Sequence, residues 1–131
     1  KFGFELQIAC PEERMPDAAA VSWVREKGAN VSITNDPTAA VAGADAVVTD
    51  VWISMGDEQQ GGALQEMLQP YRVDENLMSK AKPTAIFMHC LPAKRGQEVT
   101  DAVLDGQQSA AWDEAENRLH ANKGILAWCL S

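Results

Sequence analysis

The 131-residue sequence predicts an α/β fold in which about five parallel strands form one doubly wound, three-layer sheet. Three observations lead to this prediction. Short apolar runs alternate with helical patterns, the runs are nearly continuous in their apolar character, and polar clusters directly follow several of them. Strands buried on both faces of a sheet have this continuous character. We therefore expect helices on both faces of the sheet and ligand chemistry beyond the carboxyl ends of its strands.

Five segments are predicted to be strands because each is short, apolar and bounded by turn residues. They are residues 6–9, 31–34, 46–49, 85–89 and 109–112. Helical patterns lie between them, so consecutive strands are expected to pair in parallel through right-handed crossovers. The expected architecture is Rossmann-like.

The helical patterns cover residues 18–27, 38–41, 76–81, 100–105 and 114–130. Pro16-Asp17 precedes the first of them and Gly28 follows it, an asymmetry typical of helix ends. Thr100 is the expected cap of the fourth helix, and the last helix is long and amphipathic. Residues 56–71 are the exception, because this Gly-, Gln- and Glu-rich stretch predicts a long loop of the kind that forms lids.

Composition and charge exclude several classes of function. A formal net charge of −8 with only eleven scattered Lys and Arg residues argues against a nucleic-acid surface. No apolar run approaches the roughly 20 residues that a membrane span needs. Three cysteines without metal-ligand spacing predict neither a metal site nor a disulfide framework, and they favour the cytoplasm. The chain begins at Lys1 rather than Met, so we expect it to be part of a longer protein.

The tetrapeptide His89-Cys90-Leu91-Pro92 follows the apolar run before it, where a buried strand should end. A thiol there can contact a ligand, act as a nucleophile or share a proton, although a free cysteine is often only a small buried hydrophobe. His89 is better explained as a packed, hydrogen-bonded core histidine than as a base. Leu91 is expected to present its backbone carbonyl to the crevice.

Two further polar clusters follow strand-like runs. Asp50, with Ser54 and Met55 after it, suits the ammonium group of a substrate, because charge-assisted hydrogen bonds are strong in a water-poor crevice; Asp50 is equally explained as a turn cap. Arg118 can clamp a phosphate or carboxylate, or pair with Glu114 one helical turn earlier. If the strands are parallel, these clusters share one edge of the sheet, which raises the expectation of a site.

Three strings carry a family resemblance: Asp-Val-Trp-Ile-Ser-Met-Gly at 50–56, His-Cys-Leu-Pro-Ala-Lys-Arg-Gly at 89–96 and Asp-Glu-Ala-Glu-Asn-Arg-Leu-His-Ala at 113–121. They closely resemble the ornithine carbamoyltransferase family, and the resemblance covers essentially the whole chain. It implies that residues 1–131 form the C-terminal, ornithine-binding domain. The family's N-terminal carbamoyl-phosphate-binding domain, with its Ser-Thr-Arg-Thr-Arg and His-Pro-x-Gln motifs, is absent from this sequence, so the chain alone is expected to be inactive.

The resemblance also implies roles for individual residues. Cys90 and Asp50 are the implied catalytic pair, which steers the δ-ammonium group of L-ornithine towards losing its proton. The implied ornithine contacts are Asp50, Ser54, Met55, Cys90 and Leu91, and the implied carbamoyl-phosphate contacts are Cys90, Leu91 and Arg118. The implied products are L-citrulline and phosphate, made in arginine biosynthesis by a homotrimer without cofactor or metal.

Three other interpretations differ in how well they fit the sequence. A dinucleotide-binding module needs a Gly-x-Gly-x-x-Gly turn after the first strand, and this sequence has Cys10-Pro-Glu-Glu-Arg there. A phospho-receiver domain is disfavoured because Asp113, not a lysine, follows the last predicted strand. A non-catalytic paralogue, or an isolated amino-acid-binding module of the same fold, stays open.

Overall fold

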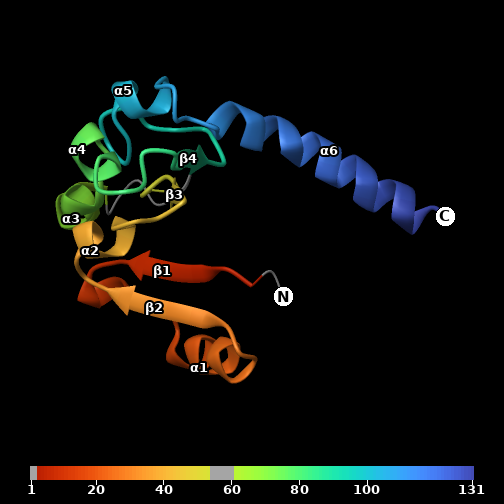
Figure 1. Ribbon diagram of the computed structural model, residues 1–131, viewed down its shortest axis with the longest axis horizontal. Helices are drawn as coiled ribbons and strands as arrows, with labels where there is room; N and C mark the ends of the chain where they lie inside the picture. The colour runs from red at the N-terminus through yellow and green to blue at the C-terminus, as the bar shows by residue number, and fades with distance from the viewer. Residues whose placement is uncertain (1–2, 54–60) are drawn as a thin grey trace.

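The structure is a computed structural model that describes residues 3–53 and 61–131. Figure 1 shows strands β1 and β2 side by side with α1 next to them, and a second group of elements around β3 and β4. Helix α2 contacts β1, β2 and α4, so it joins the two groups. The C-terminal helix α6 runs outward from β4 to the end of the chain.

The described strands are β1 (Glu5–Ala9), β2 (Asn30–Thr34), β3 (Ala46–Thr49) and β4 (Ile86–His89). β1 pairs with β2 in parallel, and β3 pairs with β4 in parallel. The α/β class and the parallel pairing are thus confirmed. The strand number is lower than expected, since the described residues form two two-stranded sheets in place of one sheet of about five strands.

The predicted strand at 109–112 is absent from its expected place. Only Ser109 forms an isolated parallel bridge, to Phe87 of β4. The backbone N–H of Phe87 donates to Gln108 (2.8 Å), and the N–H of Ala110 donates to Phe87 (2.8 Å). Helix α6 then begins at Ala111, so the segment turns into the helix before it can pair further.

The helices are α1 (Ala18–Glu26), α2 (Pro37–Val41), α3 (Gly61–Leu68), α4 (Glu75–Met78), α5 (Asp101–Leu104) and α6 (Ala111–Cys129), with short 3-10 turns at Glu12–Arg14 and Gln69–Tyr71. Polar side chains cap four of them by accepting backbone N–H groups at the first turn. The capping residues are Asp17, Asp36, Asp74 and Thr100. The expectation of a long loop over 56–71 is wrong for residues 61–71, which are helical; residues 54–60 lie outside the described part.

The core gathers around β4 and the helices that follow it. Phe87, Val99 and Ala111 are fully buried, and Leu104 is nearly so. The expectation that strands are buried on both faces is wrong. Alternate residues of β3 and β4 face solvent, and Val48 is 63% exposed. The β3–β4 sheet is therefore covered on one face only, and its apolar runs do not reflect two-sided burial.

Helix α6 packs against β4 through its first turns only. Ala111 is its one buried residue, and its large apolar side chains Trp112, Leu119, Ile125, Leu126 and Trp128 are 57–80% exposed. Such an apolar surface on a long helix marks a contact site rather than a solvated face. Within the described residues, no helix is long and apolar enough to cross a membrane.

Candidate functional site

The site begins where β3 and β4 end. Thr49 of β3 pairs with His89 of β4, so the next residues along both strands, Asp50 and Cys90, emerge at the same edge of the sheet. The Cys90 Sγ–H donates to Asp50 Oδ1 at 3.3 Å. The backbone N–H of Val51 donates to the same oxygen at 2.7 Å. Asp50 therefore caps the turn, as one of the two interpretations expects, and is also the partner of the thiol; its contact with a substrate ammonium group stays a prediction.

The acidic surroundings hold the Cys90 proton on its sulfur. The pKa of the Cys90 thiol is raised, first by its hydrogen bond to the Asp50 carboxylate, then by burial, and then by the charges of Asp50 and Glu114. A thiol with a raised pKa is a weak nucleophile near neutral pH, because the thiolate is the reactive form. Cys90 is therefore suited to donate its S–H and to contact a ligand, and poorly suited to covalent attack.

His89 is the packed core histidine that the sequence predicts, with no exposed surface. Its Nδ1 accepts the backbone N–H of Leu91 at 2.9 Å, which leaves the ring proton of the neutral form on Nε2. Nε2 faces the carboxylate of the equally buried Glu98 at 3.4 Å. Leu91 has φ +55°, a conformation that is uncommon for a residue with a side chain. The His89 contact thus fixes the turn that presents Cys90 and Leu91.

Lys94 and Glu98 complete this turn. From the sequence, Lys94 either adds positive charge to the crevice or is simply solvated, and Glu98 has no expected role. The backbone N–H of Lys94 donates to the Glu98 carboxylate. The Lys94 Nζ donates to the carbonyl of Ile53 at 3.4 Å, which links the Cys90 turn to the segment that follows Asp50. No sequence signal distinguishes Glu98, because it follows the polar run Lys94-Arg95-Gly96-Gln97.

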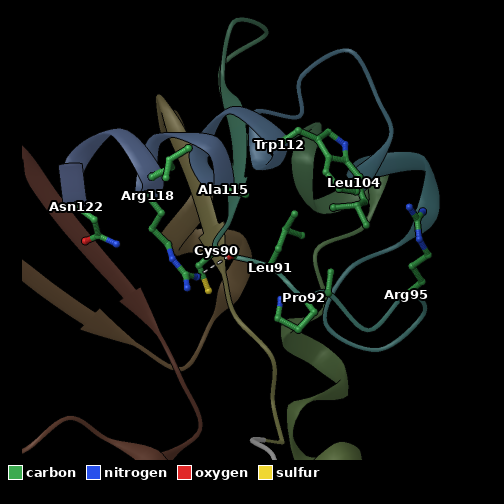
Figure 2. Close-up of a pocket in the computed structure, with 11 residues that line it drawn as sticks. Cys90, Leu91, Pro92, Arg95, Leu104, Trp112, Ala115, Arg118 and Asn122 are labelled. Atoms are coloured by element: carbon green, nitrogen blue, oxygen red, sulfur yellow. Dashed lines mark hydrogen bonds between the residues drawn. The ribbon is translucent and has the colours of Figure 1, made fainter. Parts of the chain in front are cut away.

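A pocket of about 660 Å³ lies beside Cys90, between the turn after β4 and the first turns of α6 (Figure 2). Leu91, Pro92 and Leu104 form part of its wall, and Trp112, Ala115 and Arg118 line it from α6. A second cavity of about 300 Å³, lined in part by Asp50, Trp52 and Tyr71, lies on the β1 side of β3. The Asp50–Cys90 contact therefore stands between two cavities.

The two arginines of the larger pocket have different roles. Arg118 extends from α6 towards Cys90, and its Nη1 donates to the Cys90 carbonyl at 3.4 Å. The described residues show no ion pair between Arg118 and Glu114, so the alternative surface pairing is wrong. Arg95 is engaged elsewhere, because it contacts Asp101 at 2.7 Å and Asp105 at 2.6 Å. Arg118 is thus the pocket arginine whose guanidinium lies at the site.

The ligand atoms of Asp50, His89 and Cys90 lie within 4.8 Å of one another, a cluster small enough to be compared with a metal site. The histidine does not fit this use well. Its Nδ1 already accepts the Leu91 N–H, and its Nε2 faces Glu98. A histidine that binds a metal needs a free nitrogen lone pair. The contacts of His89 therefore stabilise the turn and leave no nitrogen for an ion.

The expected site residues therefore fall into two groups. Asp50, Cys90, Leu91 and Arg118 are brought together at one edge of the β3–β4 sheet. Ser54 and Met55 lie outside the described residues, so their expected contact with the amino acid stays a prediction.

Comparison with known proteins identifies the family of this chain. The family model "Aspartate/ornithine carbamoyltransferase, Asp/Orn binding domain" matches residues 1–129. The chain therefore belongs to the aspartate/ornithine carbamoyltransferase family, in its Asp/Orn-binding domain.

Within that family, the chain is similar to proteins that are named ornithine carbamoyltransferases. It is 57% identical over 129 residues to an ornithine carbamoyltransferase of Bradyrhizobium diazoefficiens, which covers 98% of this chain and 42% of that protein. The ornithine carbamoyltransferase structure from Pyrococcus furiosus matches with a TM-score of 0.86 and 44% identity, over 95% of this chain and 41% of that one. The structure from Campylobacter jejuni matches with a TM-score of 0.88 and 33% identity, over 96% and 43%. The chain thus spans less than half the length of these relatives.

Proposed function

We propose that this chain is the ornithine-binding half of an enzyme that transfers the carbamoyl group of carbamoyl phosphate to the δ-amine of L-ornithine, giving L-citrulline and phosphate. The observation that carries the proposal is the 3.3 Å contact between Cys90 Sγ and Asp50 Oδ1 at the edge of a pocket that holds Arg118. A carboxylate, a thiol and a guanidinium at one place suit a cationic amino acid and an anionic co-substrate.

In this proposal Asp50 attracts the δ-ammonium group, which loses one proton to solvent beside the Asp50–Cys90 pair before the attack. After the attack, the same nitrogen loses a second proton to the departing phosphate. The lone pair of the neutral δ-amine attacks the carbonyl carbon of carbamoyl phosphate. The bond from that carbon to the phosphate oxygen then breaks, and phosphate leaves with the electron pair. The guanidinium of Arg118 stabilises the negative charge on the co-substrate and on the departing phosphate.

Further parts of the proposal concern the whole protein. The remaining length of the relatives leaves room for a domain that supplies most of the carbamoyl-phosphate contacts. The exposed apolar side chains of α6 give that domain a surface on which to pack. We infer that Ser54 and Met55 also contact ornithine, and that the complete enzyme is a cytoplasmic homotrimer in arginine biosynthesis.

Calorimetry and a product assay test this proposal. The chain alone should release little heat with L-ornithine and form no citrulline from ornithine and carbamoyl phosphate. Adding the separately produced N-terminal domain should give measurable ornithine binding in the presence of carbamoyl phosphate, together with citrulline formation. A mixture in which the two parts associate, yet show no ornithine heat and no citrulline, would contradict the proposal.

The role of Asp50 is tested in the complete enzyme by Asp50→Asn. Loss of a charge-assisted hydrogen bond should raise the KM for ornithine by about ten- to a hundredfold, with a much smaller change in the KM for carbamoyl phosphate. Asp113→Asn is the matched control, because Asp113 is exposed on the first turn of α6. Equal losses for both substrates would show that Asp50 does not meet the amino acid alone.

A further inference from the structure

Glu114 lies in the first turn of α6, the helix that packs against β4. Its backbone N–H donates to the Ala110 carbonyl at 2.9 Å, so the helix fixes its position. Residues four apart lie on the same side of a helix. Glu114 therefore shares a side of α6 with Arg118, whose Nη1 reaches the carbonyl of Cys90. This register places the Glu114 carboxylate one helical turn nearer the start of the helix, on the side that faces the thiol turn.

The Glu114 side chain has an unusual environment for an acid on a helix. Its Oε2 is buried and has no hydrogen-bond partner in the described part of the structure. Arg118 would be the natural partner at this spacing, but its guanidinium is directed to the Cys90 carbonyl instead. A buried carboxylate oxygen without a partner costs free energy. A role of Glu114 in the site accounts for this cost.

Charged and titratable groups lie around the turn that carries Cys90, on each element packed against it. Two are carboxylates on opposite elements, one after β3 and one on α6. The others come from α6 and from the strand and turn that carry Cys90 itself. In order along the chain these groups are Asp50, His89, Lys94, Glu114 and Arg118. Arg118 and Lys94 make their described contacts with backbone carbonyls, so neither is paired with the two carboxylates in those contacts.

We propose that Glu114 is a positioning residue of this site: its buried carboxylate, one helical turn from Arg118, adds a second negative charge beside the Cys90 turn and acts through Cys90 together with Asp50. The inference rests on the proposed function and deepens it. Cys90 then meets the substrate as an S–H donor, and the two carboxylates together give the thiol turn a negative potential that favours an amino acid with a cationic side chain. Asp50 acts by direct contact, and Glu114 acts through space.

The raised pKa of the Cys90 thiol agrees with this arrangement. Its largest cause is the hydrogen bond to Asp50, followed by burial, and the charge of Glu114 is a separate and smaller contribution. Removing the Glu114 charge alone should therefore lower the Cys90 pKa without breaking the Cys90–Asp50 contact. A fall in the Cys90 pKa with the Cys90–Asp50 contact intact separates a long-range electrostatic role of Glu114 from a packing role.

The test is the pH profile of Cys90 alkylation by iodoacetamide in the chain carrying Cys10→Ser and Cys129→Ser, so that Cys90 is the only thiol. Glu114→Gln keeps the shape of the side chain and removes its charge. This variant should alkylate roughly two- to fivefold faster than the parent at a pH below the midpoint, the range expected for one charge in a partly solvated site. Raising the salt concentration should reduce the difference. Glu114→Asp, which restores the charge, should stay close to the parental profile.

Glu116→Gln is the matched control, because its carboxylate is exposed on the same helix, near His120 at 3.8 Å. It should leave the Cys90 profile unchanged. The proposal is overturned if Glu114→Gln has the parental profile, or if Glu116→Gln shifts the profile as much as Glu114→Gln does. Alkylation needs neither substrate nor turnover, so this outcome is independent of whether the chain proves to belong to a working carbamoyltransferase.

Discussion

The buried His89–Glu98 pair gives the most demanding prediction about stability. Both side chains have no exposed surface. His89 accepts the Leu91 N–H at 2.9 Å on one nitrogen and faces Glu98 at 3.4 Å with the other. His89→Leu places an apolar side chain of similar bulk in the core and removes both polar contacts. The Leu91 N–H loses its partner, and the Glu98 carboxylate loses the imidazole opposite it.

The expected cost follows from these two losses. A buried N–H without a partner costs about 1–3 kcal/mol, and breaking a buried ionisable pair costs about 3–5 kcal/mol. The two terms do not add fully, because both losses arise from the same side chain. We expect the free energy of unfolding to fall by about 3–5 kcal/mol. This is a large share of the roughly 5–15 kcal/mol that holds a domain folded.

Urea unfolding followed by circular dichroism measures this loss. With a slope of about 2 kcal/mol per molar urea, the midpoint should fall by about 1.5–2.5 M. His120→Leu is the control, because His120 is 58% exposed and faces an exposed Glu116, and it should change the free energy by less than about 0.5 kcal/mol. A His89→Leu cost below about 1 kcal/mol, or one equal to that of the control, would refute the reasoning. Adding Glu98→Leu to His89→Leu should recover part of the loss.

Three further predictions concern the thiol, the core and an exposed ion pair. Asp50→Asn should move the alkylation profile of Cys90 to lower pH, because the hydrogen bond to Asp50 is the main cause of its raised pKa; an unmoved profile would be evidence against that contact. In urea unfolding, Leu104→Ala should cost about 2–5 kcal/mol, whereas Leu126→Ala, on exposed α6, should cost less than about 0.5 kcal/mol; similar costs would contradict the described burial. The pKa of Asp105 is lowered by its hydrogen bond to an arginine, so its ionised form stabilises the fold above the unfolded-state pKa and this contribution is lost as pH falls; Asp105→Asn should make acid unfolding less steep, which a pH titration of stability would show.

The local parts of the fold were predictable because short-range chemistry determines them. The apolar runs at 31–34 and 46–49 are strands, and Thr100 caps its helix as expected. The number of strands was not predictable, because pairing depends on partners distant in sequence. The run at 109–112 has strand character, yet α6 begins inside it. An apolar run also looks the same whether its second face is buried or exposed, which is why the exposure of Val48 was missed.

The site followed from one geometric expectation, that parallel strands bring their following residues to one edge. The contact between Asp50 and Cys90 confirms it. Partners that act through the core were not predictable, because Glu98 lies nine residues beyond His89 with no periodicity to connect them. The sequence also did not determine which group the Arg118 side chain contacts, since its spacing from Glu114 suits a surface ion pair equally well.

The central claim is that Asp50 and Cys90 together form the place where the amino acid binds. Alkylation of Cys90 by iodoacetamide in the presence of L-ornithine, with the N-terminal domain and carbamoyl phosphate added, tests it most directly. Ornithine should slow the reaction at Cys90 in a saturable way, leave Cys10 unaffected, and lose its effect in Asp50→Asn. Alkylation of Cys90 at the same rate with and without ornithine, in a mixture that forms citrulline, would contradict the claim.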